Sequence, residues 1–198
     1  MNYKDYQNTR DAAWKILLDC GIEKLPVDLN HICRQLGVGV YRYGDITMTG
    51  ETPLQGDGLL YFEGSRPVIL FDQDKPPARI RFTIAHELGH LVLGHVAAGQ
   101  GGAAKRDFSV AADPVEAAAN RFAIRLLAPA CVLWGLEAYT AQEISQLCNI
   151  SVQAAQFRAE RMLVLRGRGK FLISALEQQV YKQFQPFIRE ARQIPPGE

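Results

Sequence analysis

The stretch RFTIAHELGHLVLGH, Arg81 to His95, places two histidines four residues apart with a glutamate directly after the first. Apolar residues surround the histidines at helical spacing, which is typical of a buried helix. On such a helix His86 and His90 project from one face, with their Cβ atoms about 5–6 Å apart. Two imidazoles at that spacing can bind one zinc ion, and Glu87 then lies beside the metal, where it can take a proton from water.

A pattern this short also occurs by chance in helices that bind no metal. The neighbouring residues favour the metal site, because burying two histidines and a glutamate among Ile84, Leu88 and Leu91 without a partner costs several kcal/mol. Gly89 costs the helix about 1 kcal/mol relative to alanine. We therefore expect another part of the molecule to approach the helix closely at this glycine.

A catalytic zinc needs a third protein ligand if a water is to keep the fourth position. The pattern HExxHxxGxxH would require a histidine at position 96, and His95 does not meet it, so we expect His95 to interact with the last carbonyls of the helix. Glu116, on the next predicted helix, is the better candidate. It could instead form a capping box with Asp113. The small residues beside Glu116 would let the two helices pack closely.

The remaining sequence predicts a helix-rich α+β protein with a small sheet of about three strands. The first domain is expected to span residues 1–130, with a helical C-terminal subdomain, residues 131–198, packed on it. The expected strands are VGVYRYGDI, LLYFE and PVILFD, and the last two are joined by GSR in a hairpin. The expected helices contain NTRDAAWKILLDCG, VDLNHICRQLG, DKPPARIRF with the histidine motif, DPVEAAANRFAIRLLAP, TAQEISQLCN, SVQAAQFRAERMLVL and SALEQQVYKQF.

The pair TAQEISQLCN and SVQAAQFRAERMLVL has the rhythm of a helix-turn-helix, and four arginines follow in or after its second helix. A DNA-binding protein would place such a basic helix in the major groove. The alternative is a helical pair packed on the rest of the protein. The net charge of +1 favours this alternative, so direct nucleic-acid binding is not expected. The four arginines are Arg158, Arg161, Arg166 and Arg168.

Composition points to a soluble protein of the reducing cytoplasm. Hydrophobic residues make up 47% of the chain, no run approaches the roughly 20 apolar residues of a membrane span, and the first ten residues are polar. The four cysteines include no C-x-x-C pair, and each lies in an apolar helical context, so we expect small buried thiols.

Together these stretches resemble the ImmA/IrrE family of zinc metallopeptidases. The resemblance is carried by RFTIAHELGHLVLGH and EAAANRFAIRLLAP, and by LNHICRQLGVGVY, GDGLLYF and PVILFD upstream in the expected order, from about Val27 to Leu127. It implies a zincin-like fold with one zinc per chain, held by His86, His90 and Glu116, and Glu87 as the catalytic acid and base. It also implies a protein substrate, a helix-turn-helix transcriptional repressor. The sequence LLAP, Leu126 to Pro129, departs slightly from the family pattern, in which a methionine often precedes the proline.

Further assignments concern the groups around the metal and the substrate. Tyr61, Arg121 and Arg125 are candidates for the group that stabilises the oxyanion, and Asn120 could orient Glu116 or a loop carbonyl. The substrate is expected to pair as an extended strand with a sheet edge, LLYFE or PVILFD. The glycine-rich stretch 97–112 is expected to border the cleft as a loop that opens and closes.

Two other functions remain open from the residues. One is a DNA-binding or protein-interaction module that holds a structural zinc. Such a site would not need Glu87 and would usually close the fourth position with a cysteine or histidine. The other is a metalloenzyme that acts on a small molecule, which only the family resemblance disfavours.

Overall fold

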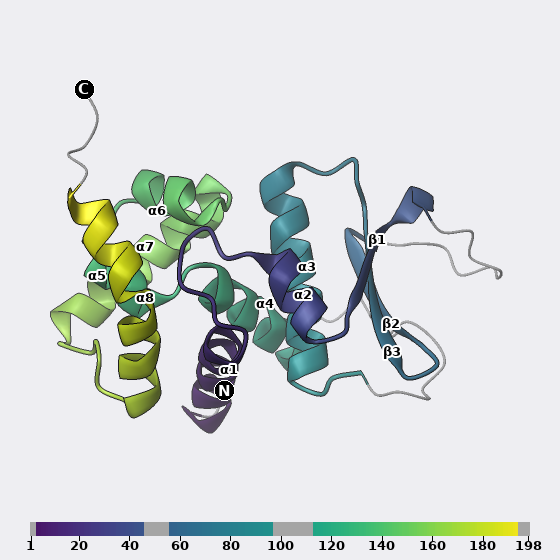
Figure 1. Cartoon of the computed structure of the whole chain (residues 1–198), viewed down its shortest axis with the longest axis horizontal. Coiled ribbons are helices and arrows are strands. Elements are labelled where there is room, and N and C mark those ends of the chain that lie inside the picture. Colours follow the sequence, from purple (N-terminus) through teal and green to yellow (C-terminus); the bar gives the residue numbers. More distant parts are fainter. Residues whose placement is uncertain (1–2, 46–55, 97–112, 194–198) are drawn as a thin grey trace. The chain divides into compact units, whose positions relative to one another are not determined.

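The computed structural model describes residues 3–45, 56–96 and 113–193 (Figure 1). Contacts divide the chain into two compact units, Met1–Thr9 with Leu29–Ala123 and Arg10–Asp28 with Ile124–Glu198. Residues 10–28 thus group with the C-terminal part of the chain, whereas the sequence analysis assigned them to the first domain. The predicted domain boundary after residue 130 stays a prediction.

The first unit contains a three-stranded sheet formed by β1 (Gly39–Arg42), β2 (Gly58–Glu63) and β3 (Arg66–Phe71). The strand order is β1-β3-β2, with β3 parallel to β1 and antiparallel to β2. The predicted hairpin is confirmed, because Glu63 pairs with Arg66 across the turn. β3 has a neighbour on both sides, so the prediction that PVILFD could be an edge strand is wrong. LLYFE lies in β2, at an edge of the described sheet.

Two helices, α2 (Leu29–Gln35) and α3 (Pro77–Val92), lie along the sheet (Figure 1). As predicted, α3 begins at paired prolines, which suit a first turn because its N–H groups have no helical partner. It carries the histidine motif and packs against β2 and β3. The two elements approach closely at Gly58, where a Cβ atom would overlap Thr83 Cγ2 and would lie 3.6 Å from Glu87 Cγ. The edge strand β2 therefore begins against the part of α3 that carries Glu87.

The helix α4 (Pro114–Leu127) follows Asp113, whose carboxylate accepts a hydrogen bond of 2.8 Å from the backbone N–H of Val115. Asp113 is thus the N-cap that the sequence predicts. A Cβ atom on Gly89 of α3 would lie only 3.2 Å from the backbone of Ala119 and 3.1 Å from Phe122 Cδ1. The close approach expected at Gly89 is confirmed, and the approaching segment is α4.

The second unit is helical. It contains the C-terminal part of α1 (Tyr3–Asp19), the end of α4, α5 (Ala130–Gly135), α6 (Ala141–Cys148), α7 (Val152–Gly167) and α8 (Ala175–Gln193). The Gln183 amide of α8 donates to the carbonyls of Leu17 and Ile22, at 2.8 and 2.7 Å, and so ties α8 to the end of α1. Phe184 is fully buried next to it in sequence. The four cysteines are buried thiols, as predicted.

The predicted helix pair is α6 and α7. Its capping box is complete, since Thr140 and Glu143 each accept a hydrogen bond from the other's backbone N–H, and Ser151 caps α7. Arg158 is buried and donates through Nε to the Ala128 carbonyl at 2.7 Å, which removes it from any DNA-facing surface. This position favours the interpretation of α6 and α7 as a packed helical pair. None of the helices in the described part of the chain has the length and hydropathy of a membrane-spanning segment.

Candidate metal centre

Three side chains from α3 and α4 converge on one point. The Nε2 atoms of His86 and His90 lie 3.0 Å apart, and the two carboxylate oxygens of Glu116 lie 3.2 and 3.3 Å from them. Two ligands bound at about 2.0–2.1 Å to a tetrahedral ion are separated by about 3.3–3.4 Å. Within the described residues, these three form the one group of histidine, cysteine and acidic side chains that could hold a metal ion. Both the donor atoms and their spacing fit zinc.

Asn120 sets the orientation of the His86 ring. Its Oδ1 lies 2.9 Å from His86 Nδ1, and an amide oxygen can only accept a hydrogen bond, so Nδ1 carries the proton. The lone pair of His86 then lies on Nε2, the atom that faces Glu116 and His90. The sequence predicts that Asn120 orients Glu116 or a loop carbonyl. It contacts His86 because it lies one helical turn after Glu116, on the same face of α4.

His95 plays the corresponding part for His90. After α3 the chain turns at Gly94, whose φ is +71°, and the backbone N–H of His95 donates to the His90 carbonyl at 2.9 Å. This turn brings His95 Nδ1 to 3.2 Å from His90 Nδ1. The expected contact with a helix carbonyl is thus made by the backbone, whereas the ring meets His90. Burial lowers the pKa of His95 by more than the charge of Glu116 raises it, so the net shift is downward. A neutral ring can accept a hydrogen bond.

Glu116 lies in the first turn of α4, where it could act as a cap or as a ligand. Its side chain is 34% exposed, and both carboxylate oxygens face imidazole nitrogens. The ligands are brought together where α4 packs on α3 at Gly89. Gly89 directly precedes His90 in α3, and Ala119, which it contacts, follows Glu116 by three residues in α4. The arrangement brings together the three ligands that the resemblance implies.

Glu87 lies between the two histidines in sequence and is only 1% exposed. It does not belong to the three-residue group. Consecutive residues of a helix are rotated by about 100°, so the side chain of Glu87 points beside the group and not into it. The start of β2 at Gly58 packs beside its Cγ. The predicted role of Glu87 as the catalytic acid and base stays a prediction; the structure places its buried side chain next to the start of β2.

The predicted oxyanion donors do not share a face with this group. Side chains three apart on a strand point to opposite faces, so Tyr61 points away from the α3 side that Gly58 meets. Burial first, and then the charge of Glu63, raises the pKa of Tyr61. On α4, Arg121 and Arg125 lie about 140° and 180° round the helix from Glu116. The geometry of the strand and the helix does not favour these three candidates, and the oxyanion-stabilising group stays unassigned.

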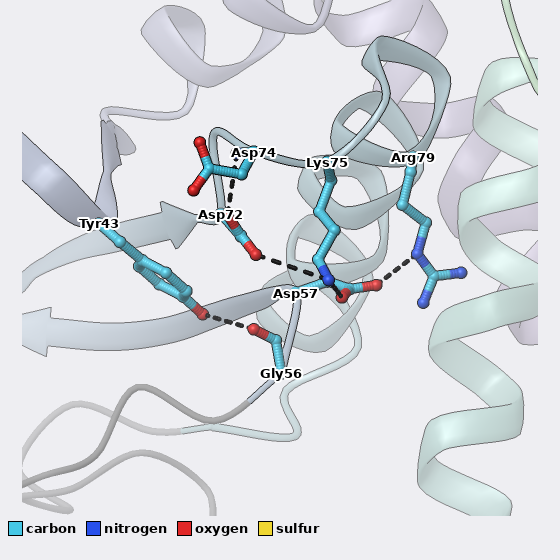
Figure 2. Close-up of polar contacts among 7 residues, drawn as sticks. All are labelled: Tyr43, Gly56, Asp57, Asp72, Asp74, Lys75 and Arg79. Carbon is cyan, nitrogen blue, oxygen red and sulfur yellow. Dashed lines mark hydrogen bonds and ion pairs between the residues drawn. The ribbon is translucent and has the colours of Figure 1, made fainter.

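A cluster of charged side chains fixes the start of β2 on the first turn of α3 (Figure 2). Figure 2 shows Asp57 between Lys75 and Arg79: the Lys75 ammonium lies 3.4 Å from the carboxylate, and Arg79 Nε donates to it. Burial raises the pKa of Asp57, but Arg79 and Lys75 together lower it more, so the carboxyl is more acidic than usual. The pairs hold the edge strand against the helix of the metal centre.

The stretch 97–112, which is predicted to border the site, lies outside the described residues.

Comparison with known proteins agrees with the geometry. The family model described as the IrrE N-terminal-like domain, a peptidase family, matches residues 47–160, which is more than half of the chain and includes all three candidate ligands and Glu87. A comparison with curated proteins found no match. With a matching family model and a metal-binding constellation inside the matched region, the chain belongs to the ImmA/IrrE family of metallopeptidases.

Proposed function

We propose that this protein is a zinc-dependent endopeptidase in which His86, His90 and Glu116 hold one zinc ion and Glu87 is the general acid and base. The observation that carries the proposal is the convergence of two imidazole nitrogens and a carboxylate, all within 4.8 Å of one another, beside a buried glutamate that is not among them. Three protein ligands leave one position of a tetrahedral ion for water, as in catalytic rather than structural zinc sites.

When bound in such a site, zinc acidifies a water molecule and polarises the carbonyl of the scissile peptide bond. Glu87 accepts the proton of the attacking water and then delivers it to the leaving amine. Asn120 and His95 lie at Nδ1 of the two imidazoles, and both Nε2 atoms face the Glu116 carboxylate. The burial of Glu87 keeps bulk water away from the proton that it carries.

The proposed substrate is a protein segment bound in extended form, and the family resemblance suggests a helix-turn-helix repressor. β2 is an edge of the described sheet and begins at Gly58, next to Glu87. An edge strand presents unpaired N–H and C=O groups, to which an added strand can bind. A substrate paired with β2 would therefore pass beside the proposed base.

The test combines metal analysis with the variant Glu87→Gln and a matched control, Glu160→Gln, which alters an exposed glutamate of α7, outside β2 and the metal centre. We expect about one zinc per chain in the wild type and both variants, and single-site cleavage of the repressor encoded beside this gene by the wild type and control only. Unchanged turnover in Glu87→Gln would remove Glu87 from the mechanism. Zinc in a wild type that cuts no protein would favour the structural-zinc module instead.

A further inference from the structure

The second unit contains a pocket of about 600 Å³ that shares no residue with the metal centre. Its volume lies within the range of about 300–1,000 Å³ that is typical of small-molecule sites. The lining combines flat aromatic rings with charged groups, most of them on or next to α5, α7 and α8. The residues that matter are Trp134, Glu137, Tyr139, Arg166, Tyr181 and Arg192.

Both arginines of the pocket are held in place by another lining residue. Arg192 Nη2 donates to Glu137 Oε1 at 2.7 Å, and the Arg166 guanidinium lies 4.7 Å from the centroid of the Tyr139 ring. A guanidinium has five N–H donors, so one bond to a carboxylate or a stacked ring leaves most of them for a ligand. The three charged lining residues sum to one net positive charge, which favours an anion.

Glu137 occupies a conformation that suits glycine. Its φ is +58°, in the left-handed region, and its N–H closes the end of α5 by donating to the Trp134 carbonyl at 3.1 Å. Any residue with a Cβ atom is strained there. The chain places a carboxylate at this position, and that carboxylate fixes Arg192. Strain of this kind is common at binding sites.

The aromatic wall is built by packing between helices. The Trp134 ring stacks on Phe171, with centroids 5.6 Å apart and planes 19° apart, and meets Tyr181 at 5.6 Å. At Gly135 a Cβ atom would lie 2.7 Å from Tyr181 and 2.8 Å from Ile188, so glycine allows α5 and α8 to approach. The rings are therefore fixed surfaces on which a planar group can lie.

We propose that this pocket binds a nucleoside phosphate. Arg166 and Arg192 would bind the phosphate, because the planar guanidinium matches phosphate oxygens in pairs. The base would lie against Trp134 and Tyr181, and the Glu137 carboxylate can accept a hydrogen bond from a ribose hydroxyl or an amino group. The volume exceeds what an inorganic anion needs, which points to a ligand with an organic body. The proposal does not depend on the metal centre or on proteolysis.

The first experiment is calorimetric titration of the full-length protein at low salt. The probes are the four common ribonucleoside diphosphates, the four parent nucleosides and inorganic phosphate. We expect at least one diphosphate to bind about tenfold or more tightly than both its nucleoside and phosphate, since it alone reaches the arginines and the aromatic wall. Failure of all four diphosphates to bind with a Kd below about 1 mM would overturn the proposal. Equal binding of inorganic phosphate would overturn it as well.

The second experiment locates the site with the variants Arg166→Gln and Arg192→Gln. Both side chains are exposed, so the fold should survive, and melting temperatures check this. Each variant should weaken diphosphate binding about tenfold or more. The matched control is Arg189→Gln, an exposed arginine one turn earlier on α8 that donates to Gln185, and it should bind as the wild type does. Equal losses in Arg189→Gln and Arg192→Gln would show non-specific attraction and refute the assignment.

Discussion

Replacing Gly89 by alanine should weaken zinc binding even though it improves the helix propensity of α3. Alanine is favoured over glycine inside a helix by about 1 kcal/mol. The new methyl group would lie 3.1 Å from Phe122 Cδ1 and 3.2 Å from both Cα and O of Ala119. Carbon atoms in contact prefer about 3.5–4.0 Å, so α4 must move away by roughly 0.3–0.8 Å. Overpacking of this kind costs about 1–3 kcal/mol, which leaves a net destabilisation of about 0–2 kcal/mol.

The same movement displaces a metal ligand. Glu116 precedes Ala119 by three residues on α4, so it moves with the helix backbone. Metal–ligand distances are held within about 0.2 Å, and a shift of several tenths of an ångström exceeds that tolerance. We therefore expect zinc affinity to fall at least about tenfold, which corresponds to about 1.4 kcal/mol.

The assay is urea unfolding of the metal-free protein together with zinc competition against a chromophoric chelator. The matched control is Gly167→Ala, in the last turn of α7, where a Cβ atom would meet nothing within 4 Å. That variant should gain up to about 1 kcal/mol and bind zinc normally. If Gly89→Ala gains as much stability as the control and binds zinc as tightly as the wild type, the reasoning from helix contact is refuted.

Three further variants test the centre and its supports. Glu116→Ala should lose zinc, whereas Asp113→Ala, which removes only the helix cap, should keep it and cost about 0.5–2 kcal/mol; equal zinc contents would contradict the ligand assignment. Asn120→Ala and His95→Ala should each weaken zinc binding about 10–100-fold in chelator competition, and wild-type affinity in both would exclude their supporting role. The folded pKa of Asp57 lies below its usual value of 3.8, so its stabilising effect is present above that value and is lost as the pH falls through the folded pKa. Asp57→Asn should therefore destabilise the protein at pH 7, and the difference in unfolding free energy between wild type and variant should shrink in acid. A difference that does not change with pH would contradict the ion-pair account.

The sequence predicted the helical part of the centre because its signals are local. The spacing of His86 and His90 places them on one face of the helix. Gly89, which lies between them, indicated that another segment packs closely there. Glu116 has no local signal that links it to the histidines, so its assignment needed the family resemblance. Asn120 lies four residues after Glu116, and that spacing could have indicated a shared site. The contact of His95 with His90 depends on the left-handed turn that follows α3, which spacing rules for ligands do not include.

Long-range features were harder to predict. The run Val68–Leu70 is fully buried, and an uninterrupted apolar run is typical of a strand covered on both faces. That signal argued against PVILFD as an edge strand and was missed. The direction in which Tyr61 points follows from strand alternation only once Gly58 is known to face α3. The grouping of residues 10–28 with the C-terminal helices has no signal in composition or periodicity.

The ligands of the metal centre come from two helices separated by a long piece of chain, with 25 residues between His90 and Glu116. The contact at Gly89 and the turn that brings His95 to His90 set the geometry of these ligands. Bound zinc would act as a cross-link that removes freedom from the unfolded chain, in the manner of a disulfide. Zinc would therefore stabilise the fold as well as serve the reaction, because it would tie α3 to α4 in the folded state only.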